Sequence, residues 1–132
     1  ERYEEMTDIK VEFNVTRIVE DLRLPPPVEI QLTRIVQEAL SNIRKHAKAT
    51  KVKVALDHND GEIRVTIADN GRGFESTRLP LKGQPHFGLQ TRRERTEALG
   101  GRFVIESATG QGTRVEVHIP LAQLRTNKVL SL

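Results

Sequence analysis

The chain of 132 residues contains no cysteine. It can therefore form neither disulfide bonds nor thiolate metal sites, which agrees with a reducing compartment. No apolar run approaches the roughly 20 residues that cross a bilayer, and the N-terminal residues do not have the pattern of a signal peptide. We expect a cytoplasmic chain that does not itself insert into a membrane.

Aromatic residues are also scarce, with one tyrosine and four phenylalanines, so surfaces on which bases could stack are few. The 21 basic and 18 acidic residues give a net charge of only +3. Basic residues gather at 44–48 and 92–95, and each cluster fits a solvated helix end better than a nucleic-acid surface. We expect no nucleic-acid partner. A non-catalytic basic binding module is the weaker alternative, and it predicts salt-dependent binding of nucleic acid and indifference to ATP.

The apolar pattern predicts a single α+β domain. Helices are expected from about Val28 to Ala47 and over 88–99, and strands over 10–15, 51–57, 63–67, from 104 and over 115–119. Because hairpins separate the helices, we expect a two-layer α/β sandwich with a mixed, mostly antiparallel sheet and helices on one face. The glycine- and proline-containing run 70–87 predicts a lid loop, or alternatively a plain surface excursion.

Three polar residues of the first helix form one stripe beside its apolar face. Glu38, Asn42 and Lys45 are spaced by four and then three residues. A carboxylate, an amide oxygen and an ammonium group in a row could polarise water, ligate a hard cation and contact phosphate. Mg²⁺ keeps waters and substrate phosphates as ligands, so Asn42 with a triphosphate makes a plausible incomplete shell. The alternative is the ordinary polar border of an amphipathic helix.

Two glycine-spaced turns follow predicted strands. In the tract 69–74, Gly71 and Gly73 can adopt positive φ and have no Cβ, so a ligand can approach the main chain. The Asp69 carboxylate could accept a hydrogen bond from the exocyclic amine of adenine, or it could simply begin an Asx-type turn. The second tract, 110–113, on its own suits a hairpin turn. No G-x-x-x-x-G-K-[ST] tract is present, so a nucleotide would need a different arrangement.

Together these tracts resemble the ATP-binding catalytic domain of sensor histidine kinases. The residues 37–42 with 45–47 resemble its N box, 69–74 its first glycine box, 87–89 its second, and 110–113 its last glycine turn. The residues 93–95 and 98–101 are similar to the subfamily whose response regulators are NarL-like. The resemblance covers about residues 10–120, and four ordered tracts are far more specific than any one of them.

This resemblance implies the Bergerat fold of the GHKL superfamily, which binds Mg-ATP under a flexible lid. By matching position, Asn42 would ligate Mg²⁺, Glu38 would be the polar or general-base residue, and Asp69 would hold the adenine amine. The other positions implied to bind ATP are Lys45 and His46 at the phosphates, Gly71, Gly73, Gly88 and Leu89 at the pocket and lid, and Gly112 and Thr113 at the adenine end.

The implied activity is transfer of the γ-phosphoryl group of ATP to a histidine, through positioning and charge. None of the four histidines precedes an acidic residue as the acceptor of this subfamily does, so the acceptor is expected on a separate dimerisation helix of a longer, membrane-tethered sensor. Residues 1–9 would then be the remnant of a connector, 10–122 the catalytic domain and 123–132 a tail. Arg92 stands where the family usually has methionine. A stand-alone ATPase of the superfamily and a serine-phosphorylating anti-sigma kinase are the alternatives.

Overall fold

The structure is a computed structural model that describes residues 9–16, 26–59, 61–73 and 88–120. Five strands form one sheet in the order β1-β2-β3-β5-β4. Their bounds are β1 Lys10–Val15, β2 Lys51–Asn59, β3 Glu62–Asp69, β4 Arg102–Ser107 and β5 Thr113–Pro120. Strand β1 pairs with β2 in parallel, and the other three pairings are antiparallel. The predicted mixed, mostly antiparallel sheet is therefore confirmed.

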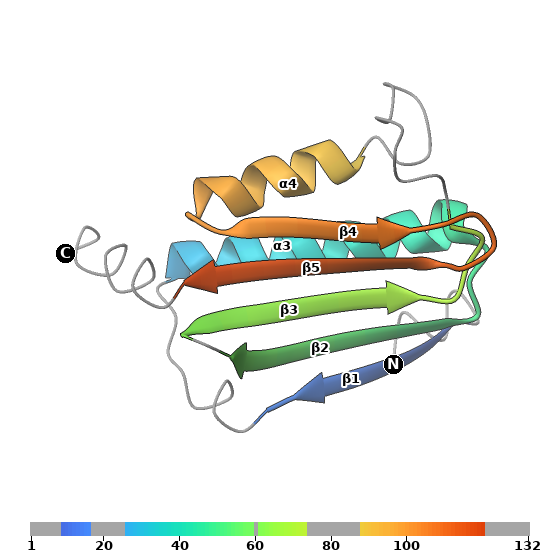
Figure 1. Ribbon diagram of the computed structural model, residues 1–132, viewed down its shortest axis with the longest axis horizontal. Coiled ribbons are helices and arrows are strands. Elements are labelled where there is room, and N and C mark those ends of the chain that lie inside the picture. Colours follow the sequence, from blue (N-terminus) through green and yellow to red (C-terminus); the bar gives the residue numbers. More distant parts are fainter. Residues whose placement is uncertain (1–8, 17–25, 60, 74–87, 121–132) are drawn as a thin grey trace.

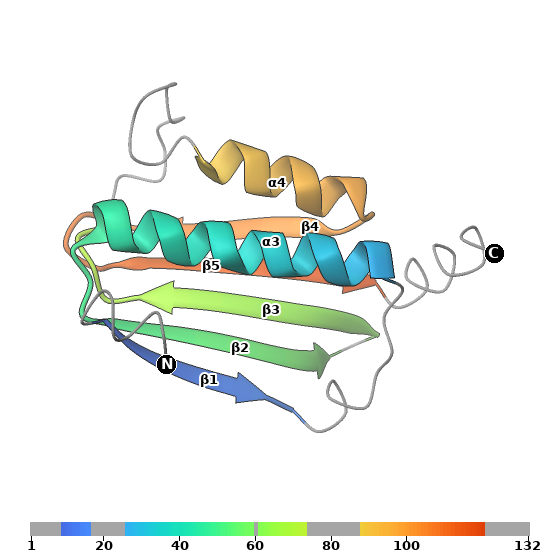
Figure 2. The same ribbon diagram turned by 180° about the vertical axis from the view of Figure 1, so that it is seen from behind.

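Two helices lie side by side on one face of this sheet, and they run in opposite directions (Figures 1 and 2). They are α3, Pro26–Asn42, and α4, Gly88–Ala98. Helix α3 begins two residues before the predicted start, because the fixed φ of proline suits the first turn of a helix. The predicted two-layer sandwich with its helices on one face is confirmed. The predicted lid loop falls largely on residues 74–87, which lie outside the described residues.

The end of the first helix differs from the prediction. The sequence predicts a continuous α-helix to Ala47, whereas the structure has a π-helical turn, η1, over Ile43–Ala47, followed by Lys48 with φ 54°. A π-turn widens the helix by bonding each N–H one residue further back, and such turns occur often at functional sites. The wide turn redirects the chain into β2.

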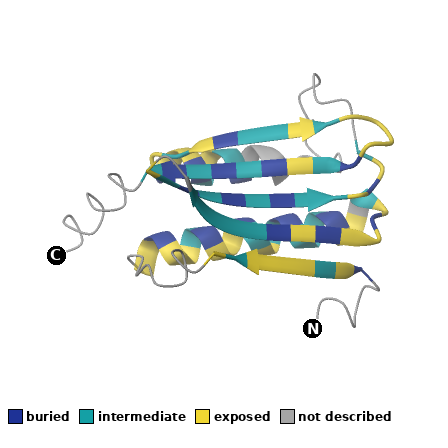
Figure 3. Cartoon of the chain, turned by 60° about the horizontal axis from the view of Figure 1, so that its bottom comes forward, coloured by how far each residue is buried: buried dark blue, intermediate teal, exposed yellow. Residues whose placement is uncertain are grey.

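The core lies between the sheet and the helices. Its buried residues come mainly from α3 and from alternate positions of the central strands, and they include Val28, Leu32, Ile35, Ala39, Val52, Val54, Ile63, Val65, Ile67, Phe103, Val115, Val117 and Ile119. Buried and less buried residues alternate along these strands in Figure 3, as expected for a sheet with one covered face. Strand β1 departs from this pattern, since Phe13 is 57% exposed at the edge of the sheet.

The buried side of helix α4 includes polar residues. The sequence offers Leu89, Ala98 and Leu99 as the apolar residues of this segment; the side chain of Leu89 lies outside the described residues, Ala98 is exposed, and Leu99 is buried together with Arg92 and Thr96. These three positions share one face because they are four and then three residues apart. Burial of the Thr96 side chain is possible because its hydroxyl donates to the carbonyl of Arg92 at 2.9 Å.

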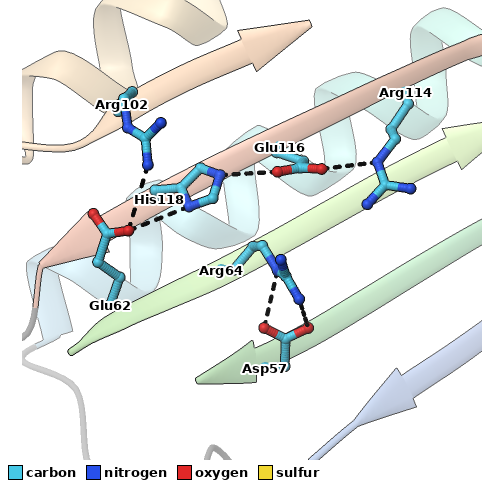
Figure 4. A network of polar contacts seen from close by, with 7 residues as sticks. All are labelled: Asp57, Glu62, Arg64, Arg102, Arg114, Glu116 and His118. Carbon is cyan, nitrogen blue, oxygen red and sulfur yellow. Dashed lines mark hydrogen bonds and ion pairs between the residues drawn. The ribbon is translucent and has the colours of Figure 1, made fainter. Parts of the chain in front are cut away.

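The opposite face of the sheet carries charged side chains that pair across strands (Figure 4). Arg64 forms a two-pronged ion pair with Asp57 at 3.0 and 2.9 Å. A second chain of contacts joins three strands, with its members in the order Arg102, Glu62, His118, Glu116 and Arg114. None of the helices in the described ranges covers this face, and cross-strand pairing of opposite charges stabilises it.

Candidate functional site

Three bends of the chain meet at the end of the sheet where β3 stops. The first follows β3, the second is η1, and the third is the turn between β4 and β5. The Arg72 N–H donates to the carbonyl of Ala47 at 2.7 Å, and the Gly110 N–H donates to the carbonyl of Arg72 at 2.6 Å. Segments far apart in the sequence are thereby tied together by main-chain hydrogen bonds. The structure thus brings together the predicted end of the first helix and both predicted glycine turns.

Glycine is required at three of these positions by the closeness of neighbouring main chain. A Cβ on Gly71 would overlap the carbonyl oxygen of Ala47, and a Cβ on Gly73 would overlap that of Ala108. A Cβ on Gly112 would overlap the carbonyl oxygen of Asp69. Gly73 and Gly112 also have φ of 63° and 80°, a region that favours glycine. The three bends can therefore lie in contact because these positions carry no Cβ.

Asp69 is the last residue of β3, and its side chain points toward the helix side of the sheet, because alternate residues share a face and Ile67 is buried there. Its Oδ1 accepts a hydrogen bond from the Gly71 N–H at 2.7 Å. Burial raises the pKa of this carboxyl, and the main-chain groups of Gly71 and Thr113 act in the opposite direction. The Asx-type turn predicted as an alternative is therefore present, and it fixes the orientation of the carboxylate.

Thr113 stands beside Asp69 as its direct partner in the pairing of β3 with β5. Its hydroxyl lies 2.9 Å from that of Ser107, which also donates to the carbonyl of Gly112 at 3.0 Å. Ser107 thus connects Thr113 to the glycine turn. Sequence reasoning missed Ser107, and the only signal for it is its position opposite Thr113 in the hairpin.

Asn70 fastens the same end of the sheet to the start of β2. Its Oδ1 accepts hydrogen bonds from the N–H groups of Thr50 and Lys51 at 2.9 Å, and its Nδ2 donates to the Thr50 hydroxyl at 2.9 Å. All of these contacts are structural. They explain why an asparagine can follow Asp69 here without itself facing a ligand.

Asn42 is the last residue of α3 and stands where the α-helix becomes the π-turn. Its side chain is half-buried and makes no capping hydrogen bond to that turn. Lys45 lies within the π-turn and is exposed. His46 belongs to the same turn, but its side chain lies outside the described part of the chain. Of the three residues of the predicted polar stripe, Glu38 and Asn42 lie on the α-helix, and Lys45 lies on the π-turn.

Glu38 lies one turn before Asn42 and faces α4. Its Oε1 forms an ion pair with Nη2 of Arg95 at 2.8 Å. Gly88 and Leu89, the predicted second glycine box, form the first residues of α4. The side chain of Leu89 is not among those described.

Two hollows flank Asp69 at this end of the sheet. One of about 400 Å³ is bordered by Ser107, Gly112 and Thr113 together with outward-facing residues such as Glu106 and Arg114. The other, of about 360 Å³, is bordered by residues of β1, by the start of β2 and by the end of β3 with Asn70, and its charged residues are Lys10, Glu12, Lys51, Lys53 and Asp69. Neither hollow reaches Asn42. Neither of them therefore connects Asp69, which is predicted to bind adenine, with Asn42, which is predicted to ligate Mg²⁺.

A metal ion at this site would depend on ligands from outside the protein. Among the residues that the structure describes, no group of three or more His, Cys, Asp and Glu side chains is placed to hold a metal ion. One amide oxygen, that of Asn42, fits a Mg²⁺ shell completed by phosphate oxygens and water. Helices in the described ranges are also too short or too polar to cross a membrane.

The fold places the protein in the class of GHKL ATP-binding domains. The family described as "Histidine kinase-, DNA gyrase B-, and HSP90-like ATPase" matches residues 28–123. The chain belongs to this family. The resemblance predicted from the four sequence tracts is thereby confirmed.

The chain is similar to proteins named as histidine kinases and to a protein named as a sensor. The chain is 42% identical over 119 residues to the signal transduction histidine-protein kinase/phosphatase DegS of Brevibacillus brevis, covering 90% of this chain and 30% of that protein. It is 38% identical to the sensor histidine kinase LiaS of Bacillus subtilis, over 78% of this chain and 28% of that protein. It is 39% identical to the sensor protein VraS of Staphylococcus aureus, over 85% of this chain and 31% of that protein. The chain spans about 30% of the length of such relatives.

Solved structures agree with the fold. The histidine kinase domain of the Erythrobacter litoralis EL346 blue-light activated histidine kinase superposes with a TM-score of 0.76 at 24% identity, covering 95% of this chain and 58% of that one. The Acinetobacter baumannii histidine kinase AdeS superposes with a TM-score of 0.69 at 14% identity, covering 90% and 57%. At these identities the likeness establishes the fold alone.

Proposed function

We propose that the chain binds Mg-ATP and donates the γ-phosphoryl group to a histidine on a separate dimerisation helix. The observation that carries this proposal is the contact of the Asp69 turn with the end of the first helix, through the bond from Arg72 to Ala47. It joins the residue assigned to adenine with the segment assigned to phosphate and metal. The relatives named as histidine kinases support a phosphoryl acceptor of the same kind.

Each residue of the site has an assigned task. Asp69 accepts a hydrogen bond from the adenine amine, with Thr113 beside it, and Gly71, Gly73 and Gly112 keep the main chain close. Asn42 offers its amide oxygen to Mg²⁺, which when bound offsets negative charge on the phosphates. Lys45 and His46 approach the phosphates, and Gly88 with Leu89 begins the helix that follows the lid. Correct placement and charge are what phosphoryl transfer needs most.

The parent protein is proposed to be a membrane-anchored sensor whose catalytic domain lies in the cytoplasm and acts on a NarL-like response regulator. Residues 10–122 would be the catalytic domain, residues 1–9 the end of a connector and residues 123–132 a tail. The names of DegS and LiaS as histidine kinases, and of LiaS and VraS as sensors, support the sensor-kinase part of this proposal. A phosphotransfer assay with a supplied dimerisation helix tests it against a serine-bearing acceptor and against ATP hydrolysis alone.

Calorimetric titration of the 132-residue chain with ATP, with and without Mg²⁺, tests the nucleotide site. The wild-type chain is expected to bind, and binding is expected to be tighter with the metal. Asn42→Ala is expected to weaken binding with Mg²⁺ by roughly tenfold, the loss of one hydrogen-bond-sized interaction, and to change metal-free binding little. An equal loss under both conditions would remove Asn42 from the metal shell. No binding by the wild-type chain would overturn the proposed function.

A further inference from the structure

The contact between the two helices is polar and is built around one carboxylate. Arg95 of α4 donates from Nη2 to Glu38 Oε1 at 2.8 Å and from Nη1 to Gln31 Oε1 at 3.3 Å. Gln31 and Glu38 are seven residues apart, so they lie on one face of α3 two turns from each other. Arg95 therefore spans two turns of α3 with a single planar guanidinium group.

A second arginine of α4 lies next to this pair. Arg92 is one turn earlier and only 3% exposed, and its Nε has no hydrogen-bond partner within the described part of the chain. Burial lowers the pKa of Arg92 to about 10, and the negative charge of Glu38 acts in the opposite direction. Arg92 is thus buried near enough to Glu38 to be influenced by its charge, while Arg95 makes the direct ion pair with this carboxylate.

The far side of α4 is held separately. Arg93 donates from Nη1 to the carbonyl of Phe103 at 3.3 Å, and its guanidinium carbon lies 5.1 Å from the centroid of that ring. Helix α4 is consequently fixed to β4 by Arg93 and to α3 by Arg95. Since α4 begins at Gly88 and Glu38 lies one turn before Asn42, the contact of Arg95 with Glu38 joins the two helices that border the proposed nucleotide site.

We propose that Glu38 is a positioning residue, which fixes α4 against α3 through Arg95. This inference rests on the proposed function for its effect on ATP. Oε1 of Glu38 accepts a hydrogen bond from Arg95 at 2.8 Å, so loss of its charge would leave Arg95 without this carboxylate partner.

The first test measures stability in the absence of nucleotide and is independent of the proposed function. Glu38→Gln and Arg95→Gln are each expected to lower the urea midpoint, and the double variant is expected to lower it no further than the more damaging single change. Additive effects would overturn the proposed contact, because uncoupled residues add. Glu94→Gln on α4 and Arg34→Gln on α3 are matched controls, since both residues are exposed and their changes are expected to add.

The second test measures ATP affinity by calorimetry. A positioning role predicts that Glu38→Gln and Arg95→Gln both weaken Mg-ATP binding by about tenfold, the loss that one misplaced contact causes. Arg95→Lys keeps the charge without the planar fork, so an intermediate loss is expected. Unchanged affinity in Glu38→Gln together with abolished phosphotransfer would identify a general base and overturn the inference. If the wild-type chain binds no ATP, the proposed function fails, while the stability test still decides whether the two helices are joined in this way.

Discussion

At the scale of single residues, Asp69 combines a structural hydrogen bond with a charge that burial disfavours. Its Oδ1 closes a turn with the Gly71 N–H at 2.7 Å, while burial raises its pKa. A carboxylate that is costly to ionise in the folded state is poorly explained by stability alone, because an uncharged side chain could accept the same bond. A carboxylate at this position agrees with the proposed hydrogen bond to the adenine amine.

Asp69→Asn is expected to separate stability from binding. The amide oxygen can still accept from Gly71, and the cost of a buried charge is gone, so the urea midpoint at pH 7 should be equal or higher. The affinity for ATP should fall by roughly 10- to 100-fold, because a charge-assisted hydrogen bond to the adenine amine is lost. Urea unfolding measures the expected change in stability, and calorimetry measures the expected loss of ATP affinity. Wild-type affinity in the variant would contradict the adenine assignment.

The pH dependence of this difference has a defined sign. Because the folded-state pKa of Asp69 lies above its ordinary value, the wild-type chain loses stability relative to Asp69→Asn as the pH rises through that raised pKa. Below the ordinary pKa the two proteins should be equally stable. A wild-type chain that gains on the variant as the pH rises would show that burial does not dominate at this carboxyl.

Local patterns made much of the site predictable. An acid at a strand end, glycines two residues apart and an amphipathic helix are properties of short segments, and the structure brings these segments together as expected. The partner of Glu38 was not predictable, because Arg95 is 57 residues away and only packing of α3 on α4 places them together. The π-turn was not predicted either; its last residue, Ala47, accepts a hydrogen bond from Arg72, a contact with a distant segment that a local pattern does not contain.

At the scale of elements, α4 shows how a helix of low apolar content can pack. Among its described side chains the polar Arg92 and Thr96 are buried, and Leu99 is buried directly after its end. The helix is held by arginine contacts on two sides, to α3 and to β4. Polar attachment of this kind makes the orientation of α4 specific, although it adds less to stability than an apolar face of the same size.

Arg92→Met is therefore expected to leave the free energy of unfolding unchanged or to raise it, by up to about 4 kcal/mol, because a buried charge with an unsatisfied Nε is replaced by an apolar group. Denaturant unfolding of the 132-residue chain measures the change. Arg93→Met on the same helix is the matched control, and it should destabilise by about 0.5–1 kcal/mol through loss of the contact with Phe103. A substantially less stable Arg92→Met variant would mean that Arg92 has a stabilising partner.

At the scale of the whole molecule, the two faces of the sheet are stabilised by different interactions. One face packs against α3 and α4, and the other carries the paired charges of Figure 4. Burial alone would raise the pKa of Glu116, but its hydrogen bonds from His118 and Arg114 lower it below its ordinary 4.5 overall. The carboxylate is therefore more favourable in the folded than in the unfolded state.

Glu116→Gln is expected to lower the free energy of unfolding at pH 7 by about 0.5–1 kcal/mol, a value typical of ion pairs near a surface. A lowered folded-state pKa gives stability that is present above the ordinary pKa and is lost as the pH falls through the lowered one. The difference between the two proteins should consequently shrink below pH 4.5. Thermal unfolding from pH 7 downward measures it, with the exposed Glu106→Gln as control. A difference that does not change with pH would exclude a charge effect.

The two ends of the sheet also differ in how much change in length they accept. At the end with Asp69, three bends touch through main chain, and Gly71, Gly73 and Gly112 leave no room for a Cβ there. One inserted residue in any of these bends would therefore disturb its contacts with the other two. At the other end, Gly61 has no neighbouring atom near its would-be Cβ. Insertions and fused tags are therefore best accommodated between β2 and β3, while the opposite rim acts as a joint of fixed length.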